Sequence, residues 1–430
     1  MRRIFSMLWI ACLYLITAAQ TPKQDIHINK AFSGGSFLAY QGPKQQQLTP
    51  APNGKKPFYI SHYGRHGSRN ITKPEVFQYL QKIMTQAHQS NVLTLLGQDV
   101  MKRIDLMEAD THERFGELTA LGAKQHEDIM YRMVERFPQI FEGNVTVTAR
   151  STTTIRSILS MSYAMIKLKA MRPNVIINQD ASVSDMNHLF HIDKELNASA
   201  LCDENMAFFE DFCQKHPTSR RLLSSLFTDT TFIDKNIDSD LFVSYLFQLA
   251  SDLQDTNLRN QFTLFDLFTE EELYLNWKKN NVQWYLGWSF CPTNGGKIPF
   301  SQRFLLRNII EQADSCIQLP HPGANLRYGH DTALLPLICL LGVNGFDLDT
   351  TDLELLEQRG WIDYQIIPMA GNLQIVFYRK NPADKDVLIK VLLNENEATL
   401  PLKTDVAPYY HWDDFRRFYL QRINNYQENP

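Results

Sequence analysis

The feature that most constrains the fold is a histidine between two arginines, placed directly after a short apolar segment. Residues 57–60 (Pro-Phe-Tyr-Ile) predict a buried strand, and residues 70–74 predict a loop. Arg65, His66 and Arg69 therefore lie where a strand ends, a common place for a ligand site in an open α/β sheet. Arginine forks match phosphate oxygens in pairs, and a histidine between them can attack phosphorus or transfer a proton. The alternative is two surface arginines beside a histidine whose hydrogen bonds are already satisfied.

A second basic cluster follows another predicted strand. Residues 145–149 alternate in a β-rich pattern and lead into Arg150, and a helix is expected to begin near Thr153 with Arg156 in its first turns. A strand that runs into such a helix is a natural anion site, because the free backbone N–H groups of the helix start point the same way. Arg150 has two interpretations, a brace of this pocket or a surface ion pair.

A third constellation is His330-Asp331, at the end of a predicted short strand and before an apolar helix over 333–341. On its own, such a pair is a metal-ligand set, an ion pair, a proton donor or only a helix cap. No spacing typical of a zinc site is present, since the chain has no Cys-x-x-Cys pair and no His-Glu-x-x-His.

Together these segments resemble the histidine acid phosphatases, the branch of the histidine phosphatase superfamily that includes phytases. Residues 65–69 (Arg-His-Gly-Ser-Arg) match the Arg-His-Gly-x-Arg signature of that family. Residues 118–125 resemble its Leu-Thr-x-x-Gly-x-x-Gln segment, and residues 150–156 its Arg-Ser-Thr-x-x-x-Arg segment. His330-Asp331 is similar to its second motif.

The resemblance implies an α/β fold with a phosphoglycerate-mutase-like core, a central sheet flanked by helices, and an inserted, mostly helical cap. It implies that His66 is the nucleophile and Asp331 the proton donor, with no cofactor and no metal. The residues implied to bind the phosphoryl group are Arg65, Arg69, Arg156 and His330.

The chain has 430 residues, long for one compact core, and suggests two lobes. We expect residues 20–172 and 318–430 to form the α/β core and residues 173–317 the cap. Residues 20–55 are expected to be an arm with little regular structure. Within the cap, the aromatic residues between 277 and 290 are either a substrate platform or, by the stronger expectation, a helical core.

The first 19 residues are typical of a secretory signal peptide. Arg2 and Arg3 precede an apolar run over 4–16, and small residues at 17–19 offer a cleavage site. We therefore expect an exported protein, periplasmic or secreted, without stable membrane insertion. A membrane anchor is the alternative, but the run is too short to span a bilayer comfortably.

Export leaves five cysteines, so they cannot all pair with one another. Cys202 and Cys213 are close in sequence, and we expect them to form a disulfide in an oxidising compartment. Cys339 lies in an apolar run and is expected to be a buried free thiol.

The closing segment narrows the resemblance. Residues 387–395, with Tyr409, Tyr410 and Trp412 beyond them, are similar to the end of multiple inositol polyphosphate phosphatases. That subgroup usually has His-Ala-Glu where this chain has His-Asp-Thr at 330–332. The implied substrate is myo-inositol hexakisphosphate, which requires a basic mouth. The candidate mouth residues are Lys73, Arg150 and His188, with Lys194 a weaker candidate.

Other functions stay open at this point. One alternative is a general acid or sugar-phosphate phosphatase, and others are a mutase or transferase of the same superfamily and a non-catalytic module that binds phosphoanions. The formal net charge of −4 gives no support to a nucleic-acid partner.

Overall fold

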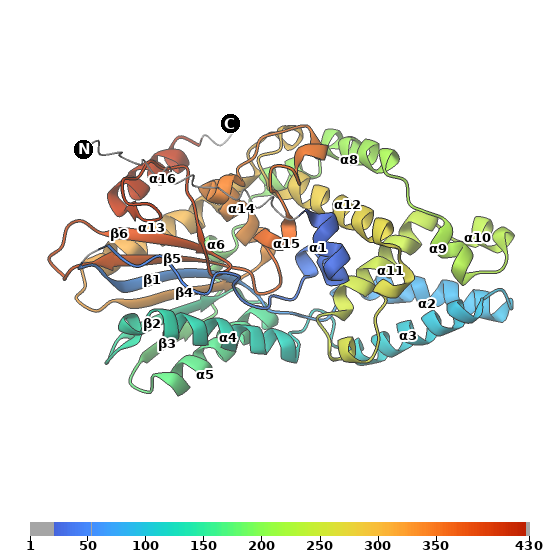
Figure 1. The fold of residues 1–430 in the computed structure, drawn as a ribbon, viewed down its shortest axis with the longest axis horizontal. Helices are drawn as coiled ribbons and strands as arrows, with labels where there is room; N and C mark the ends of the chain where they lie inside the picture. Colours follow the sequence, from blue (N-terminus) through green and yellow to red (C-terminus); the bar gives the residue numbers. More distant parts are fainter. Residues whose placement is uncertain (1–20, 53, 427–430) are drawn as a thin grey trace, which may run out of the picture.

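The computed structural model describes residues 21–52 and 54–426, and an eight-stranded mixed sheet lies at its centre (Figure 1). The strand order is β3-β2-β4-β1-β5-β6-β7, and β8 pairs with β6. Strands β1 to β4 run parallel to one another, whereas β5 and the strands beyond it pair antiparallel. The strands are β1 (Lys56–Arg65), β2 (Thr146–Ser151), β3 (Ile176–Asp180), β4 (Gly323–Gly329), β5 (Asn372–Arg379), β6 (Leu388–Leu393), β7 (Asn396–Ala398) and β8 (Tyr410–His411).

Strand β1 lies between β4 and β5 in the sheet, and both of its faces carry buried side chains. Ile60 packs into the cluster below the sheet, and Tyr59 and Tyr63 pack into the cluster above it, as the two-residue period of a strand requires. Helices cover both faces (Figure 1). Below lie α4 (Ala120–Arg136) and α5 (Ile155–Met171), and above lie α13 (Arg303–Ile317), α14 (Asp331–Leu341) and α16 (Trp412–Asn424).

A helical lobe lies beside the sheet and has its own hydrophobic cluster (Figure 1). Its helices are α2 (Pro74–Gln89), α3 (Leu95–Thr111), α9 (Arg221–Leu226), α10 (Thr230–Asn236), α11 (Ser239–Leu253) and α12 (Glu270–Trp288). The cluster thus joins residues 74–111 to part of the expected cap, while β3 of that expected cap pairs with β2 in the sheet. We propose that 74–111 belong to the helical lobe and that β3 belongs to the core.

The aromatic residues of α12 form part of the hydrophobic core. This confirms the stronger of the two expectations, a helical core and not a substrate platform. Trp277 and Tyr285 are fully buried, and Trp284 packs against the cluster above the sheet.

The remaining helices complete the described chain. They are α1 (Pro22–Ile28), α6 (Met186–Leu189), α7 (Lys194–Ala200), α8 (Asp203–Lys215) and α15 (Asp363–Ile366), with 3-10 helices η1 (Lys30–Phe37), η2 (Pro138–Phe141), η3 (Asn257–Asn260), η4 (Phe265–Leu267), η5 (Pro292–Asn294), η6 (Ile298–Gln302), η7 (Val343–Gly345) and η8 (Leu353–Leu355).

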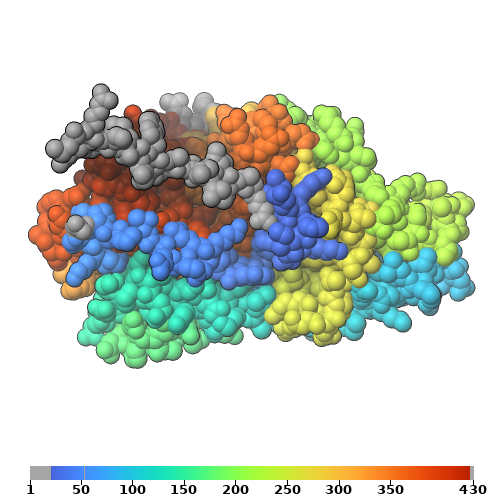
Figure 2. Space-filling view, in the orientation of Figure 1, coloured from blue at the N-terminus to red at the C-terminus, as the bar shows by residue number. Residues whose placement is uncertain are grey.

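The expectation of an irregular arm over 20–55 is wrong for its first part, which forms α1 and η1. Thr21 and Gln24 form a capping box: Gln24 N donates to Thr21 Oγ1 at 3.4 Å, and Thr21 N donates to Gln24 Oε1 at 2.9 Å. Pro22 at the first helical position supports the same start. In Figure 2 this segment is the darkest blue and lies against the yellow segments, and the lighter blue part that follows it runs between the dark red C-terminal part and the teal segments.

The predicted Cys202–Cys213 disulfide is also wrong, because both cysteines are free thiols. Cys202 caps the N-terminus of α8, and Cys213 lies near its C-terminal end. Eleven residues of helix separate their Cα atoms by about 16 Å, far beyond the span of a disulfide. Cys339 is a buried free thiol, as predicted.

The predicted signal peptide, residues 1–19, lies outside the described residues. Within the described part of the chain, every helix is too short or too polar to cross a bilayer.

Two glycines hold the signature loop against α4. A Cβ added at Gly122 would overlap the backbone oxygen of Ser68, and a Cβ added at Gly67 would overlap the backbone oxygen of Gly122. Ser68 N also donates to Gln125 Oε1 at 2.8 Å, so α4 fixes the loop backbone directly.

We expect Gly122→Ala to lower the free energy of unfolding by about 2 kcal/mol, because the added methyl group must displace backbone. Gly287 is the matched control: it also lies within a helix, but a Cβ there meets nothing within 4 Å. Gly287→Ala should instead raise stability by about 0.5–1 kcal/mol through helix propensity. Urea unfolding measures both, and equal shifts of the same sign would contradict the packing argument.

Candidate active site

The three predicted motifs meet at the carboxyl ends of β1, β2 and β4, because these strands are parallel. The register pairs Arg65 with Gly329 and Ser151 with Tyr328. His66 N donates to the carbonyl oxygen of Gly329 at 2.9 Å, so the residues that follow β1 and β4 are held side by side. The rings of His66 and His330 lie with their centroids 5.7 Å apart.

His66 has one ring nitrogen committed to the backbone. Its Nδ1 lies 2.9 Å from the carbonyl oxygen of Gly67. A carbonyl only accepts, so Nδ1 carries the proton and Nε2 keeps its lone pair. Burial lowers the pKa of His66 well below its ordinary value, and the positive charges of Arg65 and Arg156 add to this effect. The ring is therefore a neutral imidazole with a free Nε2.

Arg65 is buried and is held by three acceptors. Its Nη1 donates to the carbonyl oxygens of Ser36 and Ile367, both at 2.6 Å. Its Nη2 forms an ion pair with Asp331 Oδ2 at 2.6 Å. Its Nε has no hydrogen-bond partner among the described residues. The plane of the guanidinium is thus fixed by groups from three separate segments.

The acceptor at Ser36 comes from the 3-10 helix η1, which is itself tightly held. Ser36 N donates to the buried carboxylate of Asp363 at 2.8 Å, and Trp284 Nε1 donates to Ser36 Oγ at 3.1 Å. Phe37, the next residue, lies under the guanidinium of Arg69 at 5.0 Å. The N-terminal segment therefore orients two of the predicted phosphate-binding arginines.

Arg69 and Arg156 are the other two predicted phosphate-binding arginines, and both lie near enough to Arg65 for the charges to act on one another. Arg69 Nη1 pairs with Asp252 Oδ1 at 3.1 Å. Arg156 Nη1 lies 3.5 Å from the carbonyl oxygen of Gly116. Burial, together with the charges of Arg69 and Arg65, lowers the pKa of Arg156 to about 10. Like charges held this close favour binding of an anion with more than one negative charge.

His330 and Asp331 begin α14 directly after β4. His330 Nε2 lies 3.1 Å from Thr152 Oγ1, and burial together with Arg156 lowers the pKa of His330 to about 4. For Asp331, burial alone raises the pKa, but Arg65 and His330 outweigh it and the net pKa is lowered. In the free protein Asp331 is therefore an ionised carboxylate held against Arg65.

The predicted mouth residues differ in their surroundings. Arg150 Nη1 donates to the carbonyl oxygens of Ala149 and Asn178, both at 2.9 Å, and its Nε lies 3.6 Å from Asp185. Arg150 thus braces the β2–β3 edge of the sheet instead of contacting the six motif side chains. His188 is half-buried beside it, and burial, with Arg327 and Arg150, lowers its pKa. Lys73 is exposed at the start of α2, and Lys194 is exposed in α7.

Several groups that shape the site were missed from the sequence. The carbonyl oxygens of Ser36, Ile367 and Gly116 carry no side-chain signal, so no pattern could have found them. Asp252 lies in an ordinary helix end, and only its burial reveals it.

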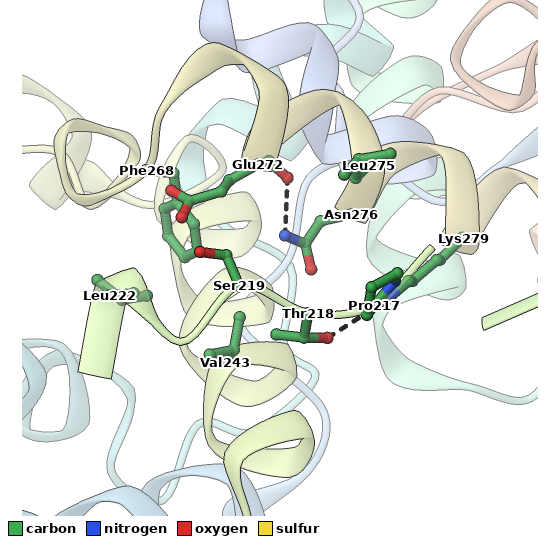
Figure 3. Close-up of a pocket in the computed structure, with 10 residues that line it drawn as sticks. All are labelled: Pro217, Thr218, Ser219, Leu222, Val243, Phe268, Glu272, Leu275, Asn276 and Lys279. Carbon is green, nitrogen blue, oxygen red and sulfur yellow. Dashed lines mark hydrogen bonds between the residues drawn. The ribbon is translucent and has the colours of Figure 1, made fainter. Parts of the chain in front are cut away.

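Two further findings bear on ligands. A small pocket in the helical lobe, lined by residues including Ser219, Asn276 and Lys279, has a volume of about 30 Å³ (Figure 3). That is room for roughly one water molecule, so the pocket cannot take a phosphate ester. In the described part of the chain, no three His, Cys, Asp or Glu side chains are grouped so that they could hold a metal ion.

Comparisons with known proteins identify the family and the fold. A sequence model of the histidine phosphatase superfamily (branch 2) matches residues 64–394. No curated protein matches the sequence. The chain superposes on Bifidobacterium longum multiple inositol polyphosphate phosphatase, in complex with inositol hexasulfate, with a TM-score of 0.75 at 17% identity, covering 89% of this chain and 96% of that one.

Two phytases are also similar. For the phytase from D. castellii the TM-score is 0.65 at 14% identity, covering 92% of this chain and 85% of that chain. For Hafnia alvei phytase in complex with tartrate it is 0.54 at 17% identity, covering 86% and 98%. The fold class predicted from the sequence is therefore confirmed.

The depressed pKa of His330 gives a test of the site's electrostatics. Between the ordinary histidine value and about pH 4, the unfolded chain binds a proton that the folded protein does not. Stability should therefore fall as the pH drops through this range, by up to about 3 kcal/mol for this residue.

We expect His330→Gln to remove that part of the pH dependence. Urea unfolding of both proteins from about pH 7 to about pH 4, which spans the two pKa values, measures the difference. Parallel curves would mean that His330 titrates normally.

Proposed function

Because the chain belongs to the histidine phosphatase superfamily (branch 2), we propose that it hydrolyses inositol polyphosphates through a phosphohistidine at His66. Membership of this family makes it a phosphomonoester hydrolase. The proposal also covers the roles of individual residues, the substrate and the export of the protein. One observation carries the chemistry: Nδ1 of His66 faces the Gly67 carbonyl, which leaves Nε2 free among the arginines.

Binding comes first. The phosphoryl oxygens accept hydrogen bonds from Arg65, Arg69 and Arg156. In the free protein, burial and the positive charges of the neighbouring guanidinium groups lower the pKa of Arg65 and of Arg156. Phosphoryl transfer depends on positioning and charge stabilisation more than on covalent chemistry by the protein. Donors that are already fixed, as those of Arg65 are, stabilise the charge that develops in the transition state without reorganising.

Transfer then follows in two steps. His66 Nε2 attacks phosphorus, the bond to the ester oxygen breaks, and Asp331 gives its proton to the leaving alkoxide. Water next attacks the phosphohistidine and passes a proton to the Asp331 carboxylate, and the phosphate leaves as the P–N bond breaks. His66 returns to its neutral form. Asp331 can gain the initial proton because the bound phosphoryl group takes Arg65 as its partner and adds negative charge nearby.

The substrate class is supported from two directions. The C-terminal segment 387–395 is similar to that of multiple inositol polyphosphate phosphatases. The Bifidobacterium longum enzyme of that name, described in complex with inositol hexasulfate, is similar over 89% of this chain. We propose myo-inositol hexakisphosphate as a substrate that loses its phosphates stepwise. We also propose that residues 1–19 direct export of the protein.

The nucleophile has a direct test. With labelled p-nitrophenyl phosphate and rapid quenching, the wild type should yield acid-labile phosphate on protein, and His66→Ala should yield none. His66→Ala should still bind inorganic phosphate through the arginines. His27→Ala is the control, since His27 is an exposed side chain on α1 and should leave trapping intact. Label on serine or aspartate would exclude a phosphohistidine at His66.

The substrate has a separate test at the mouth. Lys73 is exposed and follows Thr72, whose methyl group lies beside Gly116 and hence near Arg156. We expect Lys73→Ala to raise KM for the hexakisphosphate about two- to fivefold, the scale of one exposed charge contact, and to leave p-nitrophenyl phosphate unchanged.

Lys56→Ala is the matched control, because Lys56 is an exposed lysine at the other end of β1, about 30 Å from Arg65. One result would contradict the proposed substrate and favour a general acid or sugar phosphatase instead. That result is hydrolysis of p-nitrophenyl phosphate without phosphate release from the hexakisphosphate between about pH 4 and pH 8, which brackets the Asp and His values.

A further inference from the structure

Two buried carboxyl groups lie directly behind the signature loop and have no part in the chemistry proposed above. Asp252 lies in the last turn of α11 and Asp255 follows just after the helix, where Asp255 N donates to the carbonyl oxygen of Asp252 at 2.8 Å. They are 1% and 0% exposed. Asp252 Oδ1 pairs with Arg69 Nη1 at 3.1 Å, and Asp255 Oδ1 accepts from Ser68 Oγ at 2.5 Å. The helical lobe thus touches two consecutive residues of the signature.

Both second oxygens are left over. Oδ2 of Asp252 and Oδ2 of Asp255 are buried and have no hydrogen-bond partner among the described residues. Two ionised carboxylates this deep would need two cationic partners, and among the described residues only Arg69 forms an ion pair with either of them. Asp255 faces a neutral hydroxyl, so it is the one whose ionisation is less supported.

We propose that Asp252 and Asp255 together carry one proton and one negative charge, so that this single charge positions Arg69 for phosphate binding. Asp252 is then a positioning residue that acts through Arg69, and Asp255 is held as the neutral acid. Loss of the shared proton places a second negative charge beside Arg69, where it competes with the bound anion for the guanidinium. The proposal rests on the proposed function only in naming a tetrahedral anion as the ligand of Arg69.

The charges around the pair act in the required direction. Burial raises the pKa of Asp252 to about 7, with Arg69 opposing the rise. Burial and the neighbouring Asp252 raise the pKa of Asp255 well above its ordinary value, against Arg69 and Arg65. Both groups bind protons more tightly in the folded protein than in the unfolded chain. The free energy of unfolding should therefore fall as the pH rises above the ordinary aspartate value.

Asp255→Asn tests the shared proton, because the amide imitates the neutral acid. We expect the wild type to lose thermal stability relative to this variant as the pH rises from about 5 to about 8, across the raised pKa values. Sulfate, which stays a dianion over this range, is the ligand probe. Its dissociation constant should rise with pH by about tenfold more in the wild type than in the variant, equivalent to about 1.4 kcal/mol.

Parallel stability curves or equal weakening of sulfate binding in the two proteins would overturn the proposal. Should Asp255→Asn not fold, the infrared spectrum of the wild type at about pH 7.5, above the ordinary aspartate range, still decides. A band from a protonated, buried carboxylic acid is expected, and its absence would contradict the shared proton.

A double-mutant cycle tests the positioning role of Asp252. Asp252→Ala should lower kcat/KM for p-nitrophenyl phosphate about tenfold in the wild type and less than about twofold in an Arg69→Ala background. Equal losses in both backgrounds would make Asp252 a merely structural residue. The stability and sulfate measurements need no turnover, so they still test the pair if the proposed phosphatase chemistry fails.

Discussion

The buried guanidinium of Arg65 is the interaction on which the rest of the site depends. Removing an arginine from water costs several kcal/mol unless its donors are matched. Here the match comes from the carbonyl oxygens of Ser36 and Ile367 and from the carboxylate of Asp331, three residues far apart in the sequence. The site therefore exists only when the N-terminal segment, α14 and the turn before β5 are all in place. Its formation is tied to complete folding of the protein.

The turn before β5 is held in turn by the C-terminal segment. Asn394 Nδ2 donates to the carbonyl oxygen of Ile366 at 3.2 Å, and Asn394 Oδ1 accepts from Asn372 N at 2.9 Å. Within that turn, Ala370 N donates to the carbonyl oxygen of His66 at 3.0 Å. The similarity of residues 387–395 to one subgroup of phosphatases thus concerns a segment that supports the backbone of His66. This structural role accounts for the similarity without any contact between the segment and the substrate.

Much of this was predictable, for identifiable reasons. The segments at 57–60, 145–149 and 326–329 carry strand patterns, which placed each motif at the end of a strand, and the family resemblance implied that the motifs form one phosphate pocket. The N-terminal helices were missed because the segment is rich in Gln, Pro, Gly and Lys, although Thr21 and Gln24 form a capping box in the structure. Asp252 and the carbonyl acceptors could not be found, since tertiary packing alone selects them. The predicted disulfide is wrong because the two cysteines, although close in sequence, lie near opposite ends of one helix and are far apart in space.

The two carboxylates that face the arginines differ in a way that matters for the order of events. Asp331 has a side chain that is 17% exposed and pairs with Arg65, whereas Asp252 is 1% exposed and pairs with Arg69. In the proposed mechanism an incoming phosphoryl group displaces the first carboxylate and leaves the second in place. Displacement removes the cation that keeps the pKa of Asp331 low and puts an anion beside it, and both changes favour protonation. The acid is therefore loaded by substrate binding itself, so a carboxyl group whose pKa is lowered in the free protein can still act as the proton donor.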